Sequence, residues 1–209
     1  MAKGDKGKNT RQLIINQAAL LFTKNGYNHT SLTQILEATR LAKGGFYFHF
    51  TSKEELGCAV IKSLEEYWYN TLLPNMQKGQ NAIEKLQIML SSPGDCHSSP
   101  DCIRPTILLL NLATEMIEVN DLFSSRLKEI FQEWWKTLEC IIGEGKSTGF
   151  FKAEIDASSV AAIILSNIMG ANLLALLNND PCLYQNQLSS LKQILFKGIA
   201  ITKTNEVNK

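Results

Sequence analysis

The stretch TSLTQILEATRLAKGGFYFHFTSKEEL, residues Thr30–Leu56, decides the fold of this chain. Two short segments with helical apolar spacing flank a break at Thr39–Ala42, and the second segment covers Lys43–Phe48. Gly44 and Gly45 leave the start of that second segment without side-chain bulk, so its backbone can approach another molecule closely. The apolar residues that fix the angle between the segments are Leu32, Ile35, Leu41, Phe46 and Phe50. These parts are typical of a helix-turn-helix, whose second helix enters the major groove of DNA.

The flanking sequence extends this motif in both directions. A helical run before it ends at Gly26, which predicts a C-cap. The apolar positions of that run are Leu13, Ile14, Ala18, Leu21 and Phe22. Thr30 or Ser31 can cap the first helix of the motif, and Thr51 or Ser52 can cap a longer helix after it. The apolar face of that longer helix consists of Leu56, Val60, Ile61, Leu64 and Trp68.

Beyond residue 78 the pattern stays helical, with a long polar loop at Ser91–Arg104. The predicted helices are Ala82–Leu90, Pro105–Ile117, Asp121–Ser147, Asp156–Leu177 and Gln185–Lys203. Since no segment alternates with a period of two, the predicted class is all-α, with an N-terminal three-helix helix-turn-helix domain and a larger helical C-terminal domain. The predicted division is a mobile tail at residues 1–9, a DNA-binding domain at residues 10–51 and a second domain at residues 52–209.

The charge distribution favours a polyanionic partner for the N-terminal part. Residues 1–53 carry eight Lys and Arg against two acidic residues, a net charge of +6, while the other residues carry 13 against 18, a net charge of −5. The apolar run Val160–Leu177 is long enough to span a bilayer, but its internal Ser and Asn residues favour a buried helix, so no membrane partner is expected. The chain shows no secretory signal pattern and no CxxC pair among its five cysteines, which favours a cytoplasmic location.

The quoted stretch resembles the DNA-binding domain of TetR/AcrR-type transcription regulators. Lys43–Leu56 follows the pattern K-G-x-[FL]-Y-x-H-F-x-S-K-E-x-L, and Thr10–Tyr27 follows the opening pattern T-R-x-x-I-x-x-x-A-x-x-L-F-x-x-x-G-Y. The resemblance is strong over residues 10–60. Beyond them it is architectural, apart from Asn111–Ala113 with Glu115, a segment common in one branch of the family. The resemblance implies a DNA-binding transcription regulator, with repression favoured over activation.

The resemblance also implies roles for the matching positions. Thr30 or Ser31, Tyr47, His49 and Lys53 occupy positions that bind phosphates, and hydroxyl groups and helix starts suit phosphate oxygens. The positions that contact base edges are Lys43, Gly44 and Gly45. Three aromatic neighbours of Tyr47 are expected to lie in the core: Phe46, Phe48 and Phe50.

Three positions depart from the family pattern. Arg40 stands where Gly is frequent, in a turn that often takes a left-handed conformation, at a cost of about 1 kcal/mol. A phosphate contact from Arg40 would compensate for this cost. Ala42 stands where Ser usually caps the recognition helix, which weakens the helix start by about 1 kcal/mol. Gly45 replaces a frequent Thr or Ser, so one side-chain contact to DNA is missing.

An effector site is expected in the C-terminal domain. Aromatic and Met residues can line an apolar pocket, which suits an aromatic or apolar small molecule: Trp68, Met116, Phe131, Trp134, Trp135 and Met169. The polar groups expected to orient that molecule are Asn111, Glu115 and Asn172. For each residue, the alternative is an ordinary place in the core or on the surface.

The expected assembly is a homodimer on a palindromic operator, with two recognition helices in successive major grooves. Small residues in Asp156–Leu177 permit close helix packing, and with Gln185–Lys203 this segment could form a four-helix bundle between subunits, as the resemblance implies. An effector would shift the helix that starts near Ser52 and change the spacing of the recognition helices, which releases the DNA.

Other functions are open at this stage. Cys96 and Cys102, with His97 between them, could sense thiol oxidants, and a metal site there is a weaker alternative. An adaptor with a vestigial DNA-binding head is another. An enzyme is not expected, because the chain lacks a Ser/His/Asp arrangement, a Gly-rich phosphate loop and an HExxH motif, and no metal or cofactor is expected either.

Overall fold

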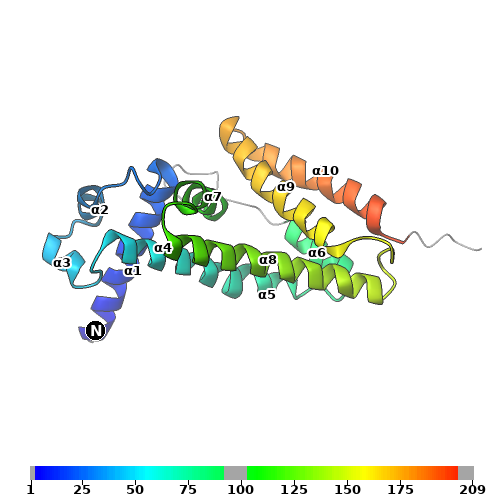
Figure 1. The fold of residues 1–209 in the computed structure, drawn as a ribbon, viewed down its shortest axis with the longest axis horizontal. Helices are drawn as coiled ribbons and strands as arrows, with labels where there is room; N and C mark the ends of the chain where they lie inside the picture. Colours follow the sequence, from blue (N-terminus) through cyan, green and yellow to red (C-terminus); the bar gives the residue numbers. More distant parts are fainter. Residues whose placement is uncertain (1–2, 92–102, 202–209) are drawn as a thin grey trace, which may run out of the picture. The chain divides into compact units, whose positions relative to one another are not determined.

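The structure, a computed structural model, describes residues 3–91 and 103–201. Within these ranges no named strand forms, and the β-pairing is limited to an isolated antiparallel bridge between Phe151 and Ala200. The all-α prediction is confirmed. The helices are α1 (Lys3–Asn25), α2 (Leu32–Thr39), α3 (Lys43–Tyr47), α4 (Lys53–Tyr67), the π-helix η1 (Trp68–Leu72), α5 (Leu73–Met76), α6 (Ala82–Leu90), α7 (Pro105–Met116), α8 (Asp121–Ser147), α9 (Ala157–Leu177) and α10 (Pro181–Ile199) (Figure 1).

The chain forms two compact units. The first is drawn from Met1–Thr71 and Gly94–Phe131, and the second from Leu72–Pro93 and Gln132–Lys209. The first unit therefore contains α7 as well as α1 to α4, and α8 contributes residues to both units. The functional division predicted at residues 51 and 52 stays a prediction. So does the mobility of residues 1–9, although α1 already begins at Lys3.

The first unit is built around α1, which packs against α2, α4 and α7. Ile14, Ala18 and Phe22 are fully buried on α1, at the helical spacing that the sequence shows. The helix ends at Asn25, and Gly26 follows with φ +83°, the left-handed geometry of a C-cap. Ring contacts then run from Phe22 to Tyr27 at 5.0 Å and from Tyr27 to Phe123 at 5.1 Å between centroids. These contacts fix the turn that leads into α2.

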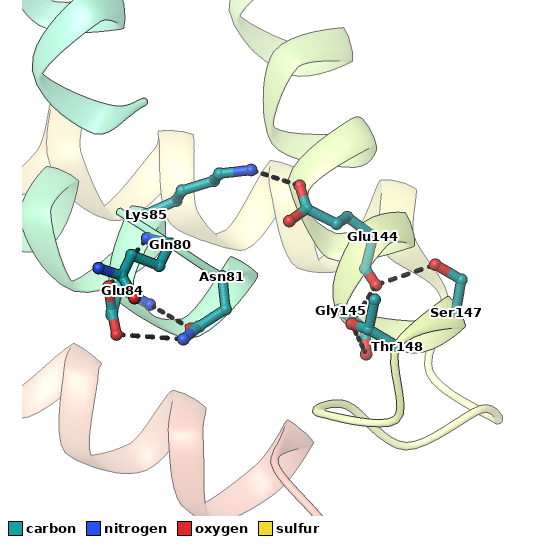
Figure 2. A network of polar contacts seen from close by, with 8 residues as sticks. All are labelled: Gln80, Asn81, Glu84, Lys85, Glu144, Gly145, Ser147 and Thr148. Carbon is teal, nitrogen blue, oxygen red and sulfur yellow. Dashed lines mark hydrogen bonds and ion pairs between the residues drawn. The ribbon is translucent and has the colours of Figure 1, made fainter. Parts of the chain in front are cut away.

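In the second unit, α9 and α10 pack along each other, and α6 packs against α5 and α10. An ion pair of 2.6 Å between Lys85 Nζ and Glu144 Oε2 joins α6 to α8 (Figure 2). Beside it, Asn81 caps α6 by accepting a hydrogen bond from the Glu84 N–H, and the Glu84 carboxylate accepts one from the Gln80 N–H. The ion pair holds α6 against the last turns of α8, and the other two contacts close the start of α6.

The helix bounds differ from the prediction around residues 68–76 and at α10. The π-helix η1 and the short α5 were not predicted; Pro74 lies in α5, and its ring would clash with the carbonyl of Asn70 in a regular α-helix. Helix α10 begins at Pro181 rather than Gln185, because Asp180 caps it by accepting a hydrogen bond from the Cys182 N–H. Most of the predicted loop Ser91–Arg104 lies outside the described residues.

Helix α9 was predicted to be buried, and that prediction holds only in part. By length and composition, it is the one helix among the described residues that could cross a membrane, with 39% of its most apolar window buried inside the chain. A core helix of a globular protein passes the same test. The exposed residues of α9 include the polar Ser166 and Asn167 and large apolar residues such as Ile163 and Leu177.

Candidate DNA interface

Helices α2 and α3 form the helix-turn-helix that the sequence predicts. Ser31 caps α2: its Oγ accepts a hydrogen bond from the Gln34 N–H at 3.2 Å, and Gln34 Oε1 accepts one from the Ser31 N–H at 2.7 Å. Ile35, Phe46 and Phe50 are almost fully buried and make the small core of the motif. This core holds α3 against α2.

The turn between the two helices carries the strain that the sequence predicts. Arg40 has φ 57° and ψ 32°, so a residue with a long side chain occupies a left-handed position. Its N–H donates to the Glu37 carbonyl at 3.2 Å, which closes the end of α2. The Arg40 side chain is exposed, and its phosphate contact stays a prediction.

The exposed face of α3 contains three of the nine residues predicted to touch DNA. Lys43, Gly44 and Tyr47 are exposed, and a Cβ built on Gly44 would meet nothing within 4 Å. Gly45 is turned inward, since a Cβ there would lie 3.6 Å from Leu41 Cδ2. His49 is half-buried. The backbone of α3 is therefore most accessible at Lys43 and Gly44.

The prediction that Phe48 lies in the core is wrong, because its side chain is 81% exposed. In a helix, residues four apart share a face, so Phe46 and Phe50 point inward together while Phe48 points away from them. Helical spacing in the sequence already places Phe48 on a different face from Phe46 and Phe50. The prediction missed this because all three are aromatic and alternate along the chain.

Thr30 and Ser31 are in different environments. Thr30 is fully buried, and its hydroxyl donates to the Gly26 carbonyl at 2.7 Å. Ser31 is exposed, with its hydroxyl 3.0 Å from Gln34 Oε1. Of the pair, only Ser31 is exposed to solvent, and its phosphate contact stays a prediction.

Lys53 lies at the start of α4, directly after the cap residue Ser52. Its Nζ donates to the Tyr27 carbonyl at 2.6 Å and lies 4.2 Å from the centroid of the Tyr27 ring. Burial lowers the pKa of Lys53, and the nearby Glu115 carboxylate opposes that shift. An ammonium group has three donors, so this internal bond leaves donors for a phosphate.

The α1–α2 turn is also held from α7. Glu115 accepts hydrogen bonds from the Tyr27 N–H at 3.1 Å and the Asn28 N–H at 2.7 Å, and Asn111 donates to the Thr23 carbonyl at 3.1 Å. Burial raises the pKa of Tyr27 to about 12, with Glu54 and Cys58 acting in the same direction. Asn111 and Glu115 thus fasten α7 to the end of α1, and an effector contact for them stays a prediction.

The other residues predicted for the effector site are distributed over both units. Trp68, Met116 and Asn172 are buried, whereas Trp135 is exposed and donates from Nε1 to Ser158 Oγ at 2.9 Å. Three further residues are half-buried: Phe131, Trp134 and Met169. Neither unit contains the whole set, so the predicted pocket is not brought together within one of them.

The predicted redox or metal residues Cys96, His97 and Cys102 lie outside the described residues. Within residues 3–91 and 103–201, no cluster of three or more His, Cys, Asp or Glu side chains could hold a metal ion. Burial raises the pKa of Cys58, and the negative charge of Glu54 raises it further. A raised pKa disfavours the reactive thiolate form of this cysteine.

Two family models match this chain, one over the helix-turn-helix and one over much of the C-terminal part. A model described as bacterial regulatory proteins, tetR family, matches residues 14–60, and one described as tetracyclin repressor-like, C-terminal domain, matches residues 101–191. The chain belongs to the TetR family. This TetR-family protein is accordingly a DNA-binding transcription regulator of the helix-turn-helix type.

Named relatives and solved structures agree with that assignment. The regulator is 24% identical to the HTH-type transcriptional repressor DhaR of Mycobacterium sp. (strain GP1), over 78% of this chain and 80% of that protein. It is 29% identical to an uncharacterized HTH-type transcriptional regulator of Lactococcus lactis subsp. lactis, over 88% and 92%. Among solved structures, a TetR transcriptional regulator from Chloroflexus aurantiacus J-10-FL superposes with a TM-score of 0.81 at 26% identity, covering 95% of this chain and 100% of that one.

The start of α3 offers a direct test of the missing cap. Ala42 has the extended backbone of an N-cap, φ −72° and ψ 157°, but forms no side-chain cap hydrogen bond. We expect Ala42→Ser to raise the free energy of unfolding by about 1 kcal/mol, because the new hydroxyl can accept from a backbone N–H of the first turn. Urea denaturation measures this. The matched control is Ala38→Ser, an exposed site inside α2 where Ser is slightly unfavourable. Equal effects at both sites would contradict the capping argument.

Proposed function

We propose that this TetR-family protein is a cytoplasmic repressor that binds a palindromic operator as a homodimer and is released by an apolar or aromatic small molecule. The observation that carries the DNA part is the exposed face of α3, where Lys43, the bare Gly44 and Tyr47 lie in a segment of net charge +6. Lys43 reads a base edge there, and Gly44 lets the backbone approach the groove. Gly45 contributes less to this close approach, because it faces Leu41 rather than the exposed side of α3.

Phosphate contacts position α3 in the groove. Ser31, Arg40, Tyr47, His49 and Lys53 supply them in this proposal, and Thr30 is left out because its hydroxyl is buried and bonded within the turn. The bond from Lys53 to the Tyr27 carbonyl adds rigidity at the same place. Lys53 thus connects α4 to the helix-turn-helix while it retains donors for DNA.

A second copy of the chain covers the apolar surface of α9 and α10 in the proposed dimer. Ile163, Leu177 and Ile194 are 49%, 72% and 71% exposed, although each is a large apolar residue on a long helix. Two such helices from each subunit form a bundle that removes this surface from water. Two-fold symmetry then presents two copies of α3 to two half-sites.

Release follows from a change in α4. The first residue of α4 bonds to the α1–α2 turn, so a shift of this helix moves the helix-turn-helix with it. An effector that favours the shifted state lowers DNA affinity by its preference for that state.

The experiment that tests the DNA part is recovery of bound fragments from the encoding genome, followed by fluorescence anisotropy on the recovered duplex over a salt series. Lys53→Ala should weaken binding to every sequence about equally and reduce the salt slope by about 1. Lys43→Ala should change the preferred base at one position of each half-site, worth about 1–3 kcal/mol. The matched control is Lys62→Ala. Lys62 is an exposed lysine of α4 whose Nζ lies 3.9 Å from Glu66 Oε1. Absence of any salt-sensitive, sequence-dependent binding by the unaltered protein would overturn the proposal.

The dimer part has its own readout. Ile194→Lys should give a monomer in sedimentation and bind the operator at least tenfold more weakly, because it places a charge in the apolar surface that the second copy covers. The fold should be retained, since Ile194 is exposed within one chain. An unaltered protein that sediments as a monomer while bound to a full operator would contradict the homodimer.

A further inference from the structure

Phe48 is the most exposed large apolar side chain among the described residues, at 81%. It directly follows α3 and keeps helical backbone angles, φ −67° and ψ −28°. It therefore continues the face of α3 that contains Gly44, four residues earlier. The His49 ring meets the Phe48 ring edge-on, with 5.0 Å between centroids and an interplanar angle of 88°. This contact favours one orientation of an otherwise uncovered ring.

The charge around Phe48 limits what can cover it. Arg40 and Lys43 are exposed nearby in the chain, and no acidic residue occurs between Glu37 and Glu54. A second copy of the same surface would bring like charges together, which disfavours self-association through this face. The major groove of DNA matches this surface in two respects. Its flanking phosphates can pair with the cations, and one of its bases carries an apolar group that the ring can contact.

We propose that Phe48 contacts the 5-methyl group of a thymine in each half-site and so selects that base. Thymine is the one standard DNA base that presents a methyl group in the major groove, and phenylalanine is among the side chains that contact it. The bare Gly44, one turn earlier on the same face, lets α3 come close enough for the ring to reach the base. This inference rests on the proposed operator binding, and it adds a specificity-determining residue to the predicted set.

The experiment uses a duplex selected from a random pool by the unaltered full-length protein. Each thymine is replaced in turn by deoxyuridine, which removes the methyl group and leaves the base pairing unchanged. We expect one position in each half-site where the change lowers affinity about fourfold, since burying one such group contributes about 0.8 kcal/mol. Phe48→Ala should bind the thymine and deoxyuridine duplexes equally. Phe48→Leu should retain a smaller preference for thymine.

Two controls show whether the lost thymine preference comes from Phe48 itself, rather than from partial unfolding or from the loss of any exposed aromatic ring. Thermal unfolding of Phe48→Ala should match the unaltered protein, because an 81% exposed ring contributes little to the core. Phe150→Ala, at a partly exposed phenylalanine in the second unit, should keep the full thymine preference.

The outcomes are distinguishable. If the unaltered protein selects no duplex, the proposed operator binding fails and the thymine contact fails with it. If it selects a duplex in which no methyl group matters, or Phe48→Ala keeps the same preference for thymine, only the thymine contact is overturned. If Phe48→Ala weakens binding to a duplex whose affinity for the unaltered protein does not depend on any thymine methyl, the ring touches sugar or phosphate instead, which also overturns it.

Discussion

Replacing Gly26 with alanine is expected to lower the free energy of unfolding by about 3–5 kcal/mol. Two costs add at this position. The backbone has φ +83°, which disfavours any residue with a Cβ, and that Cβ would collide with the Glu115 carboxylate. To avoid it, Glu115 must give up the hydrogen bonds from the Tyr27 and Asn28 N–H groups, leaving two donors without their charged acceptor.

Gly149→Ala is the matched control for this experiment. Gly149 also has positive φ, at +73°, but a Cβ there meets nothing within 4 Å. It should lose only the backbone cost, about 1–2 kcal/mol. Urea denaturation of both variants and of Glu115→Ala measures the difference, and Gly26→Ala with Glu115→Ala should cost less than the sum of the single changes. Equal losses at Gly26 and Gly149 would show that the Glu115 contact contributes nothing.

The second large effect is expected at Gly145, in the last turns of α8. A Cβ there would overlap the ring of Phe151, whose Cγ lies 2.9 Å away and whose side chain is 1% exposed. The ring is a rigid part of the core, and the Phe151 N–H donates to the Gly145 carbonyl at 2.9 Å. Gly145→Ala should therefore displace the ring or unwind the helix end, at a cost of about 3 kcal/mol.

Gly143, two residues earlier in the same helix, gives the opposite expectation. A Cβ there meets nothing within 4 Å, so Gly143→Ala should stabilise the protein by about 0.5–1 kcal/mol through the helix preference of alanine. Thermal and urea unfolding of the two variants side by side should give shifts of opposite sign. Shifts of the same sign would mean that helix preference, rather than the Phe151 contact, dominates at this end of α8.

Local chemistry explains what the sequence could predict. The bounds of α6 and α8 match the expected Ala82–Leu90 and Asp121–Ser147, and Asp156, the first residue of the predicted helix, caps α9 by accepting a hydrogen bond from the Ser159 N–H. The left-handed Arg40 was also expected, because Gly is frequent at that position in the family. In each case the deciding residue lies within one helical turn of the feature that it determines.

Other features depend on partners distant in the chain or on packing. The Asn28 N–H donates a hydrogen bond to the Glu115 carboxylate, 87 residues away in the chain. No local sequence pattern in either segment predicts this bond. The inward position of Thr30 depends on the Gly26 carbonyl and on the packing of α1, so sequence alone could not separate it from Ser31. The outward position of Phe48, by contrast, was readable from the helical geometry of the predicted segment Lys43–Phe48.

The carboxylate of Glu115 makes the Tyr27 and Asn28 amides reporters of α7 that can be followed without knowing the proposed effector. Amide protons that bond to a carboxylate resonate apart from the bulk of a helical protein, and they move when that bond lengthens. A compound library can therefore be screened by two-dimensional NMR for molecules that shift these two signals while the signals of a distant helix such as α6 stay in place. A search of this kind needs no operator and no regulated gene, and it would find ligands by their effect on the segment that supports the DNA-binding helices.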